Sequence, residues 1–230
     1  LMGGAGGLGF FIVAFLPISL ICSIIFGSWK KVLASANIFL SFLILIMINF
    51  TFLWWLAVLG SLAILALWVI KKDVFDGRWL FLPMFFLVVS LFFIIFNPQI
   101  KWIPQRVVEV NLSHRANLKI DIATIKSSPL FGTGPGTFIY NFSKYKEKDF
   151  NQNPFWDVSF YSGSSKILTI VSSLGLLGLL AWLYVMFMPV FYGVKTVVLG
   201  KSSGAVDKTK IFLALAFLVS TLVQTVGYFL

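Results

Sequence analysis

The polar side chains that could do chemistry gather in one stretch of the sequence, between about residues 97 and 166. This stretch contains His114, the single histidine of the chain, and five of the eight acidic residues. His114, Glu147 and Asp157 are the side chains of this stretch that could act as a general base. The acidic residues form no metal-binding motif, and one histidine without a cysteine cluster argues against a zinc site. We therefore expect no metal site in this stretch and no other cofactor.

A helix predicted over residues 111–127, capped by Asn111 or Ser113, would carry cations on one face. At about 100° per residue, three basic side chains share a narrow stripe with apolar shoulders: Arg115, Lys119 and Lys126. One interpretation is a helix that lies on the membrane surface and meets lipid phosphates. The other is a site for the phosphate or diphosphate of a lipid-linked substrate, to which an arginine donates two parallel hydrogen bonds.

Two further segments could contribute to a binding site. Residues 129–138, which we call the glycine loop, read PLFGTGPGTF, and Gly132, Gly134 and Gly136 permit a positive φ and a close approach of the backbone. Such a loop can turn amides toward an anion, although by composition it is more often a plain turn. Before the next apolar run, Ser164 and Ser165 could cap a helix whose first amides attract anions. Lys166 follows them and could either bind substrate or extend its ammonium group to the membrane interface.

The elements that hold these residues are membrane helices. The chain is 59% hydrophobic and 11% charged, with a mean hydropathy of +0.97, whereas soluble domains carry about 25% charged residues. Long apolar runs without alternation exclude a membrane β-barrel. The net charge of +10 comes with no nucleic-acid-binding signature, and half of the basic residues lie in short loops between apolar runs. We therefore predict an all-α, polytopic transmembrane bundle.

The apolar runs predict about six spans in a single membrane domain, over residues 8–27, 32–49, 51–70, 80–96, 164–188 and 211–230. The three short loops assigned to the inside hold two, three and four basic residues, whereas the turn at Asn49 and Thr51 holds none. The positive-inside rule then places the long loop, residues 98–165, on the extracytoplasmic face, with Trp54 and Trp55 near the outer interface. The chain stops at Leu230 inside an apolar run, so we expect a piece of a longer membrane protein.

The order of these features resembles the O-antigen ligase and polymerase family. The resemblance covers about residues 113–183. Arg115 stands at the position of the family's arginine before the loop, and a glycine pair matches the following helix, Gly175 and Gly178. The family's Pro-Leu-x-Gly-x-Gly motif is matched by Pro129, Leu130, Gly132 and Gly134.

The resemblance implies a multi-spanning glycosyltransferase of the bacterial inner membrane. It would bind a polyprenyl-diphosphate-linked glycan at the extracytoplasmic face and transfer or polymerise it onto a glycan acceptor, with inversion and without a metal. Arg115 would hold the diphosphate with help from Lys119 or Lys166, and the glycine loop would shape the pocket.

The sequence departs from the family at two places. Ser164 and Ser165 stand where the family has His-Asn, and the run Asn49–Trp55 lacks the arginine of the family's Ser-Arg pair. The alternative is a membrane protein that binds or transports lipid-linked glycans without catalysis. Transporters carry charged groups within their spans, and the predicted spans carry none at their midplanes, which favours a site at the surface.

Overall fold

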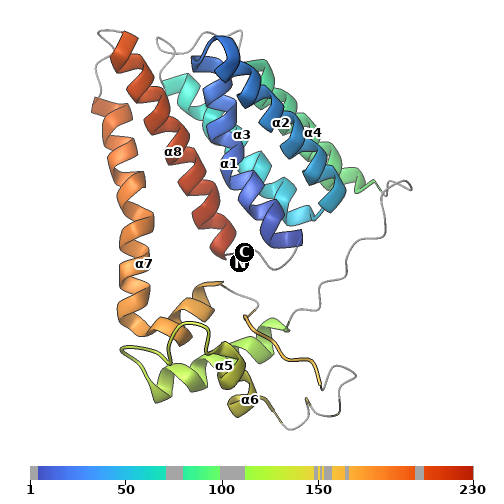
Figure 1. Cartoon of the computed structure of the whole chain (residues 1–230), viewed down its shortest axis with the longest axis vertical. Helices are drawn as coiled ribbons and strands as arrows, with labels where there is room; N and C mark the ends of the chain where they lie inside the picture. The colour runs from blue at the N-terminus through green and yellow to red at the C-terminus, as the bar shows by residue number, and fades with distance from the viewer. Residues whose placement is uncertain are drawn as a thin grey trace. The chain divides into compact units, whose positions relative to one another are not determined.

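The structure is a computed structural model that describes residues 5–70, 80–98, 112–147, 150, 152, 157–163, 166–199 and 205–229. Within these residues the chain forms helices and no strand (Figure 1): α1 (Ala5–Ile25), α2 (Ser28–Ile48), α3 (Thr51–Ile70), α4 (Phe81–Phe96), α5 (His114–Ser127), α6 (Phe138–Tyr145), α7 (Lys166–Leu199) and α8 (Ala205–Phe229). Five of them, α1, α2, α3, α7 and α8, are long and apolar enough to cross a membrane, and the sixth predicted span, α4, is shorter. The chain is an all-α, polytopic membrane protein, as its sequence predicts.

Two predicted boundaries are wrong. The sequence predicts a loop around Lys30 and Lys31, but both residues lie in the first turn of α2. The chain turns before them, at Gly27, which has an extended backbone and precedes the helix. The helix predicted to stop before Pro189 continues through that proline to Leu199. A proline removes one helix hydrogen bond, which membrane helices tolerate.

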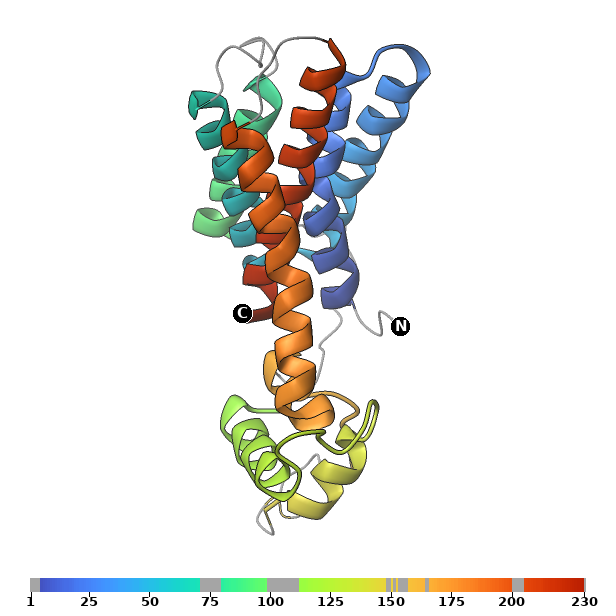
Figure 2. The ribbon, with the colours of Figure 1, turned by 90° about the vertical axis from the view of Figure 1, so that its left-hand side faces the viewer.

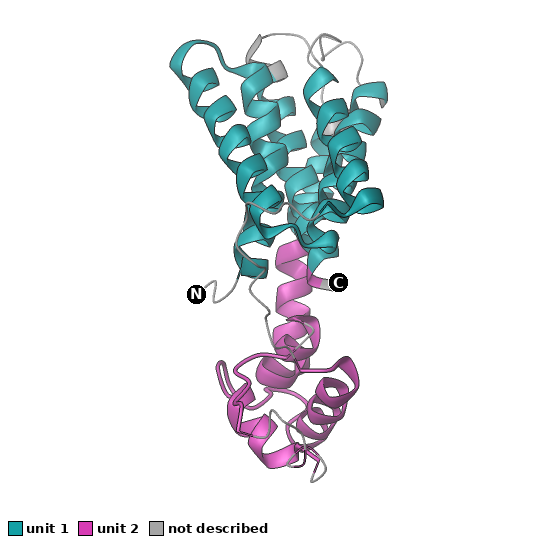
Figure 3. Ribbon diagram, turned by 90° about the vertical axis from the view of Figure 1, so that its right-hand side faces the viewer, with its two compact units in different colours: residues 1–107, 188–227 teal, residues 108–187, 228–230 magenta. Residues whose placement is uncertain are grey.

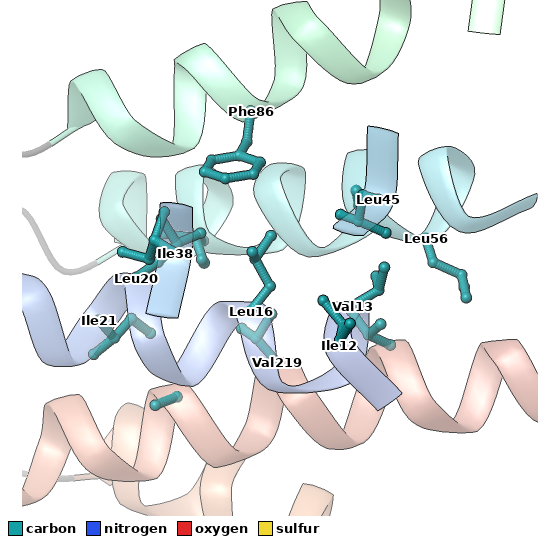
Figure 4. Close-up of a cluster of buried hydrophobic side chains, with 14 of the residues drawn as sticks. Ile12, Val13, Leu16, Leu20, Ile21, Ile38, Leu45, Leu56, Phe86 and Val219 are labelled. Carbon is teal, nitrogen blue, oxygen red and sulfur yellow. The ribbon is translucent and has the colours of Figure 1, made fainter. Parts of the chain in front are cut away.

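The chain divides into two compact units, shown in teal and magenta in Figure 3. Unit 1 comprises Leu1–Val107 and Met188–Gly227 and holds the main apolar core. Figure 4 shows that core between the helices, where α1 contributes Leu16 and Leu20, α4 contributes Phe86 and α8 contributes Val219. All four side chains are almost completely buried, and between membrane helices such side chains stabilise the bundle through close packing, because lipid is as apolar as they are.

The turn between α2 and α3 falls at the polar break that the sequence predicts. Asn49 ends α2 in the left-handed conformation at φ 43°. Its side chain accepts a hydrogen bond from Trp54 Nε1 (2.9 Å) and donates one to the carbonyl of Pro98 (3.2 Å). Trp54 is therefore fully buried and stacked on Phe93, with ring centroids 4.3 Å apart. Trp54 thus faces the core of the bundle, whereas Trp55 is exposed, and the position of both near the outer interface stays a prediction.

Unit 2 comprises Val108–Phe187 and Tyr228–Leu230, so it takes in most of the predicted loop and the first part of α7. Its small core joins α5 and α6 to the segment before α7. Phe142 is central to it: its ring lies 5.3 Å from the rings of Phe150 and Phe160, edge to face with both. The residues that the sequence singles out for chemistry belong to this unit.

Candidate functional site

The glycine loop is built into the hydrogen-bond ladder of α7. In a regular helix the carbonyls of Ser172 and Ser173 would accept hydrogen bonds from the amides four residues later. The backbone of α7 instead breaks at Gly175, with φ 70° and ψ −169°, and the helix bends there (Figure 1). The carbonyl of Ser172 accepts from the amide of Thr133 (3.2 Å), and that of Ser173 accepts from the amide of Gly134 (2.7 Å).

The two amides on the other side of the break are satisfied by the same loop. Leu176 donates its amide hydrogen to the carbonyl of Pro129 (3.0 Å), and Leu177 donates to the carbonyl of Leu130 (3.2 Å). The yellow-green chain of the loop lies against this end of α7 in Figure 2. Four backbone groups that the bend would leave without partners are thus paired, and an unpaired buried group would cost about 1–3 kcal/mol.

Glycine is required at the crossing point for two reasons. Gly132 and Gly175 have φ values of +65° and +70°, which other residues rarely adopt. A Cβ atom on Gly132 would stand 2.5 Å from the carbonyl carbon and oxygen of Ser173, and one on Gly175 would stand 2.5 Å from the amide nitrogen of Gly132. By contrast, a Cβ atom on Gly136 would meet no atom within 4 Å.

Side-chain hydrogen bonds hold the glycine loop to α6. The hydroxyl groups of Thr133 and Thr137 are 2.7 Å apart, and Thr137 donates to the carbonyl of Gly134 (2.6 Å). Asn141 of α6 donates to the hydroxyl of Thr133 (2.7 Å). The amide of Gly132 donates to the carbonyl of Ser128 (3.1 Å). With the amides of Gly132, Thr133 and Gly134 all bonded within the protein, none of these three can bind an anion in this structure.

The cationic helix forms where the sequence predicts it. Ser113 caps α5 and accepts a hydrogen bond from the amide of Ala116 (3.3 Å). His114 and Arg115 in the first turn are exposed. Lys119 forms an ion pair and a hydrogen bond with Glu147, with their side chains 46% and 55% exposed. The hydrogen bond and charge of Lys119, and to a lesser extent the charge of Arg115, lower the pKa of the Glu147 carboxyl.

The remaining predicted site residues lie on both sides of the start of α7. Asp157 is exposed in the segment before the helix, and Lys166 is exposed at its first position. Ser164 and Ser165 lie outside the described residues. The structure therefore brings Gly132 and Gly134 against α7 and joins Lys119 to Glu147, and no contact that it describes links these two groups.

The sequence interpretation missed a buried polar face of α5. Asn117, Asp121 and Thr124 recur at helical spacing on the side opposite to the cations, and all three are fully buried. Thr124 donates to the carbonyl of Ile120 (2.8 Å). Among the residues that the structure describes, the side-chain polar atoms of Asn117 and Asp121 have no hydrogen-bond partner. The same 100° periodicity that revealed the cationic stripe would have revealed this face.

Burial raises the pKa of the Asp121 carboxyl to about 6, and the nearby Ser172 hydroxyl opposes that effect. Ser172 itself donates to the carbonyl of Thr169 (3.2 Å). The carboxyl group thus lies next to the segment of α7 that receives the glycine loop, in a setting that favours its neutral form.

No protein-family model matches this chain, and a comparison with curated proteins finds no relative. The resemblance to the O-antigen ligase and polymerase family therefore rests on the residues of this chain alone, and what it implies about activity stays a prediction.

Proposed function

We propose that this chain is a membrane glycosyltransferase-like protein of the O-antigen ligase and polymerase type. It would transfer or polymerise a polyprenyl-diphosphate-linked glycan at the outer face of the bacterial inner membrane. One observation supports the proposal most: the two glycine motifs that carry the resemblance meet in space. The loop that begins at Pro129 is hydrogen-bonded across the bend at Gly175, which gives a physical reason for their occurrence together in one sequence.

Arg115 is the group best suited to hold the diphosphate. It is exposed in the first turn of α5, whose cap and buried face fix the helix in unit 2. A guanidinium group offers a diphosphate two parallel hydrogen bonds, which an ammonium group cannot do. Lys119 is already paired with Glu147, so Lys166 is the better second cation.

A general base would activate the acceptor hydroxyl group. The ion pair with Lys119 lowers the pKa of Glu147, and a weaker base takes a proton less readily. His114 and Asp157 are the other two candidates, and both are exposed. His114 is adjacent in sequence to Arg115, which would place it near a bound diphosphate.

The decisive experiment compares two exposed cations on the same helix, Arg115 and Lys126. Glycan transfer by the full-length protein is measured for Arg115→Ala, Arg115→Lys and Lys126→Ala at equal expression. A charge-assisted contact of roughly 1.5–3 kcal/mol predicts a loss of about ten- to a hundredfold for Arg115→Ala, with partial recovery in Arg115→Lys. Equal losses at positions 115 and 126 would contradict a diphosphate site and leave a helix that lies on the membrane surface.

The alternative is a protein that binds or transports lipid-linked glycans without catalysis, and the substitution of the family's His-Asn by Ser164 and Ser165 favours it. The two functions differ in one result. A wild-type protein that binds the lipid-linked glycan through Arg115 but transfers none of it, with an acceptor present, would establish the alternative.

The extracytoplasmic position of unit 2 is tested by labelling intact cells. A membrane-impermeant thiol reagent should modify a cysteine at the exposed position Asp157 and should not modify one at Ser203, in the basic loop assigned to the inside. The reverse pattern would contradict the proposed orientation.

A further inference from the structure

The bend at Gly175 divides α7 into two segments with different surroundings. The first segment, 166–174, is attached to unit 2 by polar groups: the amide of Gly163 donates to the hydroxyl of Thr169 (3.2 Å), and the carbonyls of Ser172 and Ser173 accept from the glycine loop. The second segment exposes large apolar side chains in every turn: Leu176, Leu177, Leu180, Tyr184, Val185, Phe187 and Phe191.

The length of the second segment matches the thickness of a membrane. The apolar stretch of α7 covers 31 residues, Lys166–Thr196, which as a straight helix would extend about 46 Å. The hydrocarbon core of a bilayer is about 30 Å thick. The part that follows the bend, residues 176–196, extends about 31 Å by itself, so it is long enough to cross the hydrocarbon core alone. This length fits a membrane span that begins at the bend and ends near Lys195.

The glycine loop is fixed to the first turn of this span. The carbonyl of Leu130 accepts a hydrogen bond from the amide of Leu177, and the carbonyl of Pro129 accepts one from Leu176. If the span begins at the bend, the backbone of Leu130 lies at the level where α7 would enter the hydrocarbon core. The side chains of Leu130 and Phe131 are 54% and 75% exposed there, and water would solvate such side chains poorly.

We propose that Leu130 and Phe131 form an apolar tip that inserts into the lipid bilayer beside the first turn of the α7 span. The partner is the membrane lipid itself: the acyl chains next to the headgroups accept both side chains. This contact seats the glycine loop at the membrane surface and holds the bend of α7 at a fixed depth. The proposal depends on the geometry of α7 and stands whether or not the protein transfers glycans.

The test measures lipid contact at single positions of the full chain. Cys22, the single cysteine, is replaced by serine, and a cysteine is introduced by Phe131→Cys or, as a second position, Leu130→Cys. An environment-sensitive bimane label is attached, and the protein is placed in phosphatidylcholine–phosphatidylglycerol nanodiscs. Asp157→Cys, exposed and charged in the wild type, is the aqueous control, and Val185→Cys, in the middle of the span, is the lipid control.

The label at position 131 or 130 should emit at shorter wavelength than the label at 157. Phospholipids with a nitroxide near the headgroup should quench it, as those with a nitroxide deeper in the acyl chain quench the label at 185. Iodide in the water should quench only the label at 157. Emission and iodide quenching at both 130 and 131 that equal those at 157 would overturn the proposal. A label at both positions that emits at short wavelength but is quenched by neither iodide nor nitroxide lipids would also overturn it, because protein rather than lipid would then cover the tip. Both side chains are exposed, so neither replacement removes a core contact.

Discussion

Replacing Gly132 with alanine tests whether the glycine loop and the bend of α7 form one structural element. The added Cβ atom would stand 2.5 Å from the carbonyl carbon and oxygen of Ser173 and 2.6 Å from the amide nitrogen of Gly175. These are backbone atoms, so no side-chain rotation relieves the clash. The loop and the helix must separate, and the hydrogen bonds from Thr133 to Ser172 and from Gly134 to Ser173 are lost with that movement.

The expected destabilisation follows from two terms. A non-glycine residue in the left-handed conformation costs roughly 1–2 kcal/mol. Each lost backbone hydrogen bond contributes about 0.5–1.5 kcal/mol, and two to four of them cross this contact, so the free energy of unfolding of unit 2 should fall by roughly 2–8 kcal/mol. Gly136→Ala is the matched control, since Gly136 also has a positive φ of +75° but a Cβ atom there meets nothing within 4 Å. It should cost only the first term, about 1–2 kcal/mol.

The measurement is thermal unfolding of the purified full chain in detergent, together with the rate of limited proteolysis within residues 112–163. We expect Gly132→Ala to lower the midpoint and to speed cleavage much more than Gly136→Ala does. If the two variants lose stability equally, backbone conformation alone explains the glycines, and the hydrogen-bonded contact between loop and helix contributes nothing measurable.

Two further predictions concern buried polar groups. Folding raises the pKa of the Asp121 carboxyl from 3.8 to about 6, so the folded state binds this proton more tightly than the unfolded state does. The free energy of unfolding should therefore fall by roughly 1–3 kcal/mol as the pH rises from 4 to 6 and then level off. Asp121→Asn should remove that fall in thermal unfolding at pH 4 and pH 7, whereas Asp157→Asn, at an exposed position, should not. Asn49→Gly keeps the left-handed backbone but leaves the buried indole N–H of Trp54 without its acceptor, so it should cost about 1–3 kcal/mol. Asn97→Gly, at an exposed left-handed position, should cost less, and equal midpoints would show that the side chain of Asn49 contributes nothing.

The sequence predicts the helices well because hydrophobic length and polar breaks are local signals. A run of 39 uncharged residues between Lys31 and Lys71 is too long for one span, and the chain turns at Asn49, the polar residue at its middle. Ser113 as the cap of α5 is local in the same way. The prediction that this helix ends before Pro189 fails because the rule behind it is local. The helix breaks instead at Gly175, where the glycine loop, about forty residues earlier in the chain, supplies the hydrogen-bond partners.

The candidate site is harder to predict because its key contacts join distant segments. The spacing of Gly132, Gly134 and Gly136 predicts a tight loop but not its partner, which lies about forty residues later, around Gly175. Amides that could have faced an anion are bonded to helix carbonyls instead. The sequence identifies Asp121 as an acidic residue but does not predict its burial, which depends on how α5 packs against the rest of unit 2.

The contact between loop and helix also decides which variants can report on function. A helix that breaks needs partners for the carbonyls and amides freed at the break, because leaving such groups buried without a hydrogen bond is costly. The glycine loop supplies those partners, so Gly132 and Gly175 variants will lose any activity through loss of structure, whatever the reaction is. Arg115 is different: it is exposed, and its replacement removes no core contact. A loss of transfer in Arg115→Ala, with partial recovery in Arg115→Lys and little effect of Lys126→Ala, would therefore speak for a substrate contact, and no glycine variant can do so.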